Sequence, residues 1–191
     1  MALGFYFDGN RCSGCKTCVI ACKDFKELPV GINFRRVFSM ETGTYPKAQA
    51  YHYSMACNHC ETPACVVNCP SGAMHKGDDG TVQHDDEICI GCQTCVQSCP
   101  YEVPQFRKDL GIVQKCDSCI QRREAGQAPS CVAACPMRAI EFGDVDEIVA
   151  KHGSDLVKEL PFLPAADQTN PNTNISAKPV SLATDYREAV I

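Results

Sequence analysis

The sequence has little of what marks membrane, nucleic-acid-binding and substrate-converting proteins. It contains no tryptophan, and no apolar run approaches the 18 or more residues that a membrane helix needs. It has no basic stripe, and its formal net charge of −5 disfavours binding to nucleic acid. It also lacks a glycine-rich phosphate loop and a nucleophile paired with a base, so we expect no catalytic site in this chain.

Targeting signals are missing from the sequence as well. The first residues do not form a basic segment followed by a long apolar core, so we expect no secretory signal. The pair Arg35-Arg36 lies too far into the chain to be a twin-arginine signal. We therefore expect any transport across a membrane to depend on the signal of a partner.

Cysteine is the residue in excess, and its sixteen copies fall into four groups of four with none left over. Group one is Cys12, Cys15, Cys18 and Cys22; group two is Cys57, Cys60, Cys65 and Cys69; group three is Cys89, Cys92, Cys95 and Cys99; group four is Cys116, Cys119, Cys131 and Cys135. Group three has the spacing C-x2-C-x2-C-x3-C followed by Pro100, which is typical of bacterial four-iron clusters. Groups two and four differ by an insertion before the third cysteine, and group one lacks the closing proline.

Two other uses of cysteine fit this pattern less well. Disulfide frameworks have no reason to repeat C-x2-C four times. Zinc sites also use C-x2-C pairs, but a zinc site needs neither a third cysteine close behind nor a closing Cys-Pro. A zinc-stabilised interaction module is therefore only a formal alternative, and the pattern favours iron–sulfur clusters.

The ligands of each cluster are expected to come from two groups. In two-cluster ferredoxins the fourth cysteine of a group serves the other cluster of the pair. Groups two and three are adjacent and joined by a hairpin signal at Asp79-Gly80, so they pair with each other, which leaves group one to pair with group four. The four predicted sites are Cys12, Cys15, Cys18 and Cys135; Cys22, Cys116, Cys119 and Cys131; Cys57, Cys60, Cys65 and Cys99; and Cys69, Cys89, Cys92 and Cys95.

This pairing predicts an α+β fold of two ferredoxin-like [4Fe-4S] modules, one inserted in the other, with short strands and helices. The outer module comprises residues 1–50 and 101–153, the inserted module residues 51–100, and a C-terminal tail residues 154–191. The proline-rich tail is either disordered in isolation or an extended arm that binds a partner. Because neither module has long apolar segments, we expect the clusters to serve as core and the cluster-free chain to be largely unfolded.

Local patterns predict several elements of these modules. Residues 3–8, 34–41 and 48–55 are rich in aromatic and β-branched residues and are expected to form strands, the last two as a pair. Residues AMH and TVQH flank the hairpin signal of the inserted module. Asp144 and Glu147 form a capping-box pattern at the start of a short helix.

Polar side chains beside the cysteine groups receive no catalytic role. Six basic residues either offset part of the negative charge of bound clusters or are ordinary solvated side chains: Arg11, Lys16, Lys23, Lys115, Arg122 and Arg123. His59 lies between two predicted ligands, but no ligand is missing there. The other histidines are expected at the surface or in strands: His52, His75, His84 and His152.

The chain resembles a known family over roughly residues 4–153. The resemblance rests on the motifs RCSGCKTC, ACKDFK, FRRV, ACNHC, CPSGAMHK, CIGC, CPYEVPQ, KCDSC and RAIEFG. These are similar to the four-cluster iron–sulfur, or electron-transfer, subunits of the dimethyl sulfoxide reductase family of molybdenum enzymes, and within it to the iron–sulfur subunit of dimethyl sulfoxide reductase. Every ligand position is cysteine, which favours four [4Fe-4S] clusters over a three-iron variant.

The resemblance implies that the chain lies between two partner subunits. It implies a catalytic subunit that carries molybdopterin guanine dinucleotide and a quinol-linked membrane anchor, with the outer module facing the catalytic subunit and the inserted module facing the membrane side. Assembly in the cytoplasm is expected, with the finished complex peripheral to the cytoplasmic membrane or exported with a signal-bearing partner. The alternative function is a freestanding polyferredoxin that shuttles electrons between soluble oxidoreductases such as hydrogenases.

Overall fold

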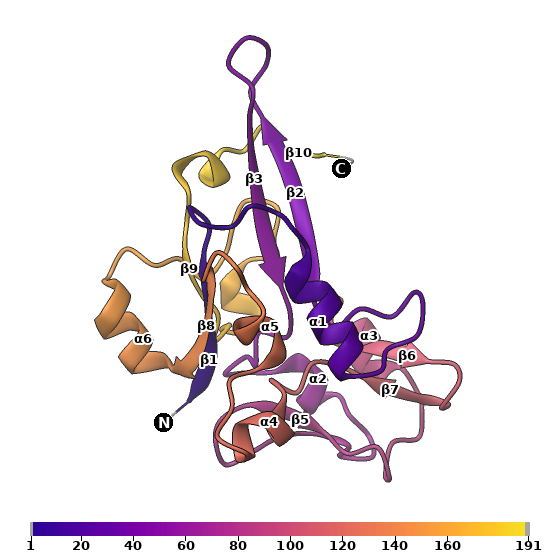
Figure 1. Cartoon of the computed structure of the whole chain (residues 1–191). Coiled ribbons are helices and arrows are strands. Elements are labelled where there is room, and N and C mark those ends of the chain that lie inside the picture. The colour runs from indigo at the N-terminus through magenta and orange to yellow at the C-terminus, as the bar shows by residue number, and fades with distance from the viewer. Residues whose placement is uncertain (1, 190–191) are drawn as a thin grey trace.

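A three-stranded sheet joins the N-terminal strand to two segments far away in the sequence. The computed structural model describes residues 2–189. Strand β1 (Leu3–Asp8) lies in the middle of the sheet, between the antiparallel β8 (Ile140–Asp144) and the parallel β9 (Asn174–Ser176). Figure 1 shows this sheet beside helix α6 (Val145–His152), whose first turn is capped by the Asp144 side chain. The strand over residues 3–8 and the capped helix are both confirmed.

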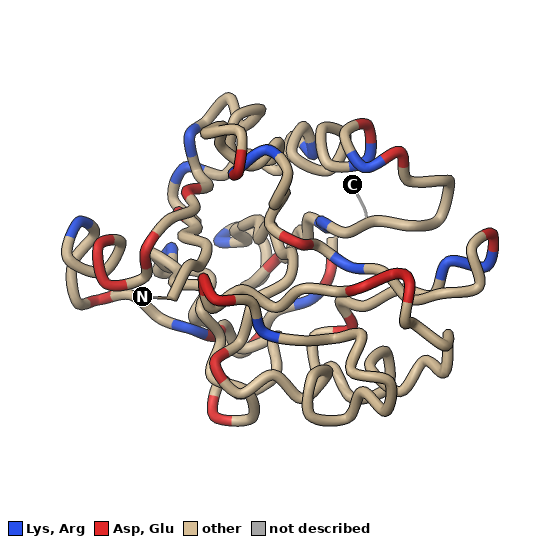
Figure 2. The backbone as a smooth tube through the Cα atoms, turned by 90° about the horizontal axis from the view of Figure 1, so that it is seen from below, with Lys and Arg blue, Asp and Glu red and all other residues tan. Residues whose placement is uncertain are grey.

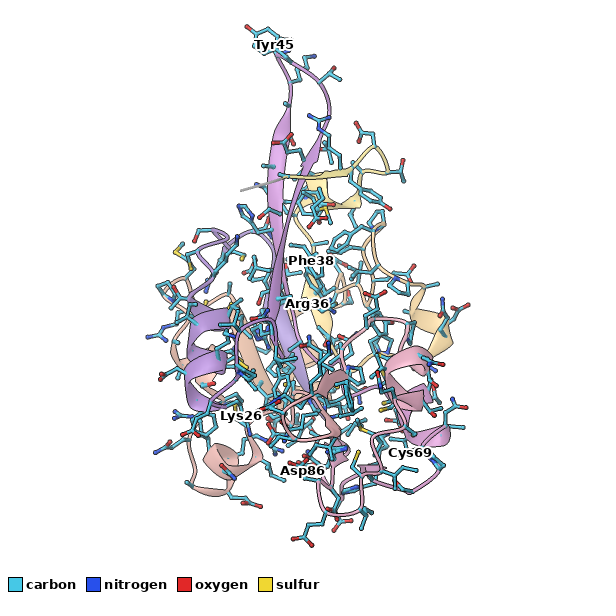
Figure 3. All side chains as sticks on the ribbon, turned by 90° about the vertical axis from the view of Figure 1, so that its right-hand side faces the viewer. Lys26, Arg36, Phe38, Tyr45, Cys69 and Asp86 are labelled. Atoms are coloured by element: carbon cyan, nitrogen blue, oxygen red, sulfur yellow. The ribbon has the colours of Figure 1, made fainter. Side chains whose placement is uncertain are left out.

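A long hairpin projects from the body of the molecule (Figure 1). Strand β2 (Arg36–Thr42) pairs antiparallel with β3 (Gln49–Met55) along its full length, which confirms the predicted strand pair. The short β10 (Arg187–Glu188) adds to the other edge of β2. Tyr45 lies at the tip, at the top of Figure 3.

Two small ribbons flank the remaining cysteine groups. Strands β4 (Met74–Lys76) and β5 (Val82–His84) form the hairpin predicted inside residues 51–100. Strands β6 (Gln105–Arg107) and β7 (Ile112–Gln114) form a second ribbon just before group four.

Most of the helices are short because cysteine loops or prolines lie next to their ends. The first is α1 (Thr17–Phe25), which continues past group one because no proline follows Cys22. It packs against α5 (Ser130–Ala133), which carries a cysteine of group four. In the same way α2 (Ala64–Val67) packs against α3 (Thr94–Ser98), so helices of groups two and three meet.

Helix α4 (Ile120–Glu124) and the 3-10 helices η1 (Ala166–Gln168) and η2 (Pro179–Leu182) complete the chain. No helix within residues 2–189 is long and apolar enough to span a bilayer.

Cysteines form part of the hydrophobic core. The larger buried cluster surrounds Phe5 and Phe7 with cysteines from groups one, two and four. A smaller cluster packs Cys65 and Cys95 around Met74, Val82 and Val113. Aromatic and aliphatic side chains make up most of this core, and buried thiols pack among them.

The C-terminal segment packs on the rest of the chain. Backbone bonds join residues 169–172 to residues 58–62, including Glu61 N–H to the carbonyl of Asn170 at 2.8 Å and Asn172 N–H to the carbonyl of Asn58 at 3.0 Å. Leu160 and Ile175 are buried in the larger core cluster. The structure therefore matches neither expectation for this segment as stated, because residues 154–189 pack on a surface of this same protein.

Candidate iron–sulfur sites

The sixteen cysteines form four candidate sets, each named by its first residue. The Cys12 site comprises Cys12, Cys15, Cys18 and Cys135; the Cys22 site comprises Cys22, Cys116, Cys119 and Cys131; the Cys57 site comprises Cys57, Cys60, Cys65 and Cys99; the Cys69 site comprises Cys69, Cys89, Cys92 and Cys95. All sixteen thiols lie in the described part of the chain, and none of them forms a disulfide. The sets are those predicted from the spacing of the four groups.

The loops of groups one and three have the same backbone conformation. Residues 12–18 and 89–95 each turn through a glycine with positive φ, +72° at Gly14 and +66° at Gly91. Each then passes through a second left-handed residue, Lys16 in one loop and Gln93 in the other, directly before a helix. The recurrence supports duplication of one cysteine-loop design within the chain.

Hydroxyl groups next to these loops contact the two most exposed cysteines. The Thr17 hydroxyl donates to Cys15 Sγ at 3.3 Å, and the Thr94 hydroxyl lies 3.4 Å from Cys92 Sγ. In both cases the threonine lowers the pKa of the cysteine by hydrogen bonding, the largest effect on either thiol. A lowered thiol pKa favours the thiolate, which is the form that binds metal.

Groups two and four use a second loop design. His59 and Ser118 both have positive φ, 43° and 56°. Their backbone N–H groups donate to the first cysteine of the group, His59 N–H to Cys57 Sγ at 3.5 Å and Ser118 N–H to Cys116 Sγ at 3.4 Å. Hydrogen bonds of this kind to cysteine sulfur are among the interactions that set the potential of a bound cluster.

Backbone N–H groups that follow two of the closing Cys-Pro pairs also donate hydrogen bonds to cysteine sulfur. Met74 N–H donates to Cys69 Sγ at 3.4 Å, and Ala139 N–H donates to Cys135 Sγ at 3.3 Å. These are the last cysteines of groups two and four, which show the repeated Cys-Pro-x-x-Ala pattern. Both sulfurs therefore accept from a backbone N–H after the Cys-Pro pair, although the donor is the alanine of the repeat at Cys135 and the residue after that alanine at Cys69.

Thiols of the outer groups one and four lie close together. One cavity is lined by the four members of the Cys12 site, Cys12, Cys15, Cys18 and Cys135. Burial raises the pKa of Cys12, and Cys18, Cys135 and Cys15 add to that rise. For the Cys22 site, burial and the neighbouring thiols of Cys131 and Cys119 raise the pKa of Cys22 to about 12.

Thiols of the inner groups two and three also affect one another across the groups. Burial raises the pKa of Cys65 to about 12, and the thiols of Cys57, Cys99 and Cys60 contribute. Burial raises the pKa of Cys95 to about 11, with contributions from the thiols of Cys69, Cys89 and Cys92. In both cases the cysteines named are members of one predicted set.

This donor chemistry fits iron–sulfur clusters. Clustered, buried thiols keep their protons unless a cation stabilises the thiolates, and iron supplies that charge when it binds. Within residues 2–189 no three Cys, His, Asp or Glu side chains come close enough to bind a single metal ion. The thiolates of a four-iron cube are held apart by the cube, so its ligands need not converge on one ion.

Charge effects between thiols of different candidate sets, together with one shared core cluster, indicate an order along the molecule. The thiol of Cys18 in the Cys12 site raises the pKa of Cys131 in the Cys22 site, after the larger effect of burial. The thiol of Cys57 likewise raises the pKa of Cys116. Cys65 and Cys95 share the smaller core cluster, which joins the Cys57 and Cys69 sites. These links order the four candidate sets as Cys12, Cys22, Cys57 and Cys69.

The exposure of their cysteines distinguishes the first and last sets of this series from the sets between them. Cys15 in the Cys12 site and Cys92 in the Cys69 site are the two exposed cysteines of the chain. Every cysteine of the Cys22 site is buried. In Figure 3, Lys26 at the end of α1 and Cys69 lie on opposite sides of the lower half of the molecule. The two sites with an exposed ligand are thus the first and the last of the series.

Basic residues near the sites differ in burial. Figure 2 shows Lys and Arg positions interspersed with Asp and Glu positions along the chain. Of the six basic residues singled out in the sequence, Lys115 is buried, and its ammonium donates to the carbonyl of Cys116 at 3.0 Å. Arg123 pairs with Asp79 at 2.8 Å. Lys23 donates to two backbone carbonyls beyond α1, at 2.7 and 2.8 Å.

Two residues, His59 and Arg35, are buried beside the candidate sites, which the sequence did not indicate. His59 is fully buried, its Nδ1 accepts from Val82 N–H at 3.0 Å, and burial holds its pKa well below the usual value. Its carbonyl accepts from Asn172 Nδ2 at 2.8 Å, so it connects the C-terminal segment to the Cys57 site. Arg35 is 3% exposed and lies among thiols of the outer groups. The only signal for it was the FRRV motif, in which charged residues interrupt an otherwise strand-like run.

Family models match most of the cysteine-bearing chain. One described as a 4Fe-4S dicluster domain matches residues 48–145, and one described as a 4Fe-4S binding domain matches residues 9–31. Together the two matches contain all four cysteine groups.

Curated relatives align over most of their own length. The sequence is 45% identical over 195 residues to the B chain of anaerobic dimethyl sulfoxide reductase from Escherichia coli (strain K12), covering 96% of this chain and 94% of that protein. It is 38% identical over 143 residues to the thiosulfate reductase electron transfer subunit PhsB of Salmonella typhi, covering 73% and 74%. It is 37% identical over 167 residues to the B subunit of sulfite dehydrogenase from Allochromatium vinosum, covering 76% and 70%.

Proposed function

Since this protein belongs to the family of iron–sulfur subunits that includes the B chain of anaerobic dimethyl sulfoxide reductase, we propose that it conducts electrons between a molybdopterin-containing catalytic subunit and a second redox partner. The family resemblance drawn from the motifs is confirmed. Its sixteen cysteines suit four [4Fe-4S] clusters. When bound, each cluster can take up and release one electron. Molybdopterin guanine dinucleotide belongs to the partner.

The Cys12, Cys22, Cys57 and Cys69 sites are the proposed ligand sets. The mutual effects of the thiols on their pKa values within each set support this assignment. The packing of α1 on α5 and of α2 on α3 supports the nested arrangement, in which residues 51–100 are inserted between residues 1–50 and 101–153. Each module then combines one loop of the first design with one of the second.

The observation that carries the proposal is the exposure of one ligand at each end of the series. Cys15 and Cys92 are exposed, while the Cys22 site between them is buried. Exposed ligands at two separate sites allow electrons to enter at one and leave at the other. The two sites in between have no exposed cysteine, and the Cys22 site is entirely buried.

Exposed apolar side chains lie near the Cys12 site and near the Cys69 site, where they provide docking surfaces for partner subunits. Ile20 in α1 and Met137, which lines the cavity of the Cys12 site, are exposed at one end. Val67, Ile88 and Ile90 are exposed beside cysteines of the Cys69 site. From the family arrangement, the Cys12 end binds the catalytic subunit and the Cys69 end faces a membrane anchor or other electron donor. The chain itself is then peripheral to the membrane.

The alternative of a freestanding polyferredoxin is not favoured by the relatives, which are named as chains or subunits of reductases and a dehydrogenase. The test is purification from native membranes with iron and molybdenum or tungsten measured in the same fractions. We expect this chain to co-purify with a large subunit that contains the second metal. A monomer that carries iron and has no large partner would overturn the proposal.

A further inference from the structure

Arg35 is a buried cation without a carboxylate partner. It directly precedes β2 and is 3% exposed. No Asp or Glu within residues 2–189 forms an ion pair with it. Transferring an unpaired charge into a protein interior costs several kcal/mol in general, so buried guanidinium groups are normally paired. An anion is therefore expected next to Arg35.

Its hydrogen-bond donors are only partly used. Nη1 donates to the Ser54 hydroxyl at 3.0 Å and to the Ser54 carbonyl at 3.2 Å. The Phe5 ring lies 4.8 Å from Cζ, in cation–π geometry. Nε and Nη2 are buried, and neither has a hydrogen-bond partner among the described residues. Unsatisfied buried donors point to an acceptor that is present in the working protein.

The negative charges that act on Arg35 are those of thiols, and Arg35 in turn acts on the buried Tyr53 hydroxyl. Burial alone would lower the pKa of Arg35, but negative charge on Cys131, Cys18, Cys116 and Cys22 raises it above its usual value. Conversely, the positive charge of Arg35 lowers the pKa of Cys22 and Cys131, against the larger effect of burial. Three of these four cysteines belong to the Cys22 site, and Cys18 belongs to the Cys12 site.

Ser54 links the guanidinium to the second of these sites. The Ser54 hydroxyl, which accepts from Arg35 Nη1, lies 3.3 Å from Cys18 Sγ. A hydroxyl that accepts from Arg35 has its own proton free to donate to sulfur. Arg35 thus acts on the Cys22 site through its charge and on the Cys12 site through Ser54.

We propose that Arg35 is the counter-charge at the junction of the two outer clusters and raises the reduction potential at the Cys22 site and, by a smaller amount, at the Cys12 site. This inference rests on the proposed function and its ligand sets. When a site takes one electron from its neighbour, a four-iron cluster and its thiolates pass from roughly −2 to −3. A fixed positive charge stabilises the more negative state more strongly, so Arg35 keeps the Cys22 site easier to reduce.

The test compares three variants in the complex purified with its partner subunits. Arg35→Met removes the charge and the donors, and Arg35→Lys keeps a charge but not the planar fork. Arg36→Met is the matched control, because this neighbouring guanidinium instead donates to the carbonyls of Tyr101 and Glu102 at 2.9 and 3.0 Å. Iron content and the midpoint potential of each cluster are measured, the latter by redox titration with electron paramagnetic resonance. The signal altered in a Cys119→Ser variant identifies the Cys22 site.

We expect Arg35→Met to lower the reduction equilibrium constant at the Cys22 site at least about tenfold, which is about 59 mV for one electron. Arg35→Lys should stay within about threefold of wild type, since it retains the charge. Arg36→Met should leave the Cys22 site unchanged.

Three results would overturn the role of Arg35. One is an Arg35→Met complex with full iron and wild-type potentials, and another is an equal shift in Arg36→Met. The third applies if Arg35→Met does not assemble. A tenfold change in the reduction equilibrium constant of the Cys22 site in Arg35→Lys would then show that the charge of Arg35 does not set the potential. Failure of the proposed function looks different, because the wild-type chain would then purify with iron but without a large partner subunit.

Discussion

Gly91 is the position in the cysteine loops where an added methyl group would meet backbone. A Cβ built there lies 2.3 Å from the carbonyl oxygen of Gly111, in the turn between β6 and β7. Real Cβ atoms essentially never come closer than 3.0 Å, so the two segments would have to separate by 3.0 − 2.3 = 0.7 Å. That movement would push the loop of the Cys69 site away from the β6–β7 ribbon.

Two costs add in the Gly91→Ala variant. The residue has φ +66°, and the left-handed region costs a residue with a Cβ about 1–2 kcal/mol. Overpacking against a rigid neighbour adds about 1–3 kcal/mol. We therefore predict that Gly91→Ala lowers the free energy of unfolding of the cluster-loaded chain by about 2–5 kcal/mol.

Two other glycines separate these costs. Gly126 has φ +71° with nothing within 4 Å of a built Cβ, so Gly126→Ala should show only the conformational cost of about 1–2 kcal/mol. At Gly14 the built Cβ meets the ring of His52, with Nδ1 at 2.6 Å. A side chain can move aside more easily than a backbone carbonyl, so Gly14→Ala should fall between the other two.

The assay is anaerobic denaturant unfolding of the cluster-loaded protein, followed by the visible absorbance of the clusters and by iron release. The expected order of loss is Gly91→Ala, then Gly14→Ala, then Gly126→Ala. A Gly91→Ala protein as stable as Gly126→Ala would refute the close approach of the two backbones.

Further predictions test the ligand sets, the role of metal and two local contacts. Cys99→Ser should damage the Cys57 site and spare the Cys69 site; spectra that show the reverse would exclude crossed ligands. Removal of iron with a chelator should leave a largely unfolded chain, and a cooperative thermal transition in the iron-free protein would contradict this. Asp144→Ala should destabilise the protein by about 0.5–2 kcal/mol, because the Asp144 side chain accepts from two N–H groups at the start of α6; chemical unfolding measures it. Burial would raise the pKa of Asp79, but hydrogen bonds lower it overall. The Asp79 carboxylate therefore stabilises the fold at neutral pH, and this stabilisation is lost as the pH falls through the lowered pKa. Asp79→Asn should therefore lower the thermal midpoint at pH 7, while a neutral result would show that the carboxylate contributes nothing.

Elements with short-range causes were predictable from the sequence. The strand at residues 3–8, the β2–β3 pair and the capped start of α6 depend on neighbouring residues, such as Asp144 and the N–H groups just after it. Strand β9 was missed because its strand partner is β1, far away in the chain, with no turn signal between the two. A segment of that kind has no local pattern to detect.

The sequence by itself determined the metal chemistry and the family. Four repeats of closely spaced cysteines require a cofactor that binds many thiolates, and that requirement depends only on spacing along the chain. Tertiary structure decided which ligands are exposed and which charges are buried. Cys15 and Cys92 occupy equivalent places in similar loops, yet nothing local shows that they are the exposed pair. Arg35 and Arg36 are adjacent, and only the packing of segments distant in sequence buries the first among thiols while the second reaches toward Tyr101. Burial and electrostatic environment are sums over neighbours from the whole chain, so they exist only once the chain is folded.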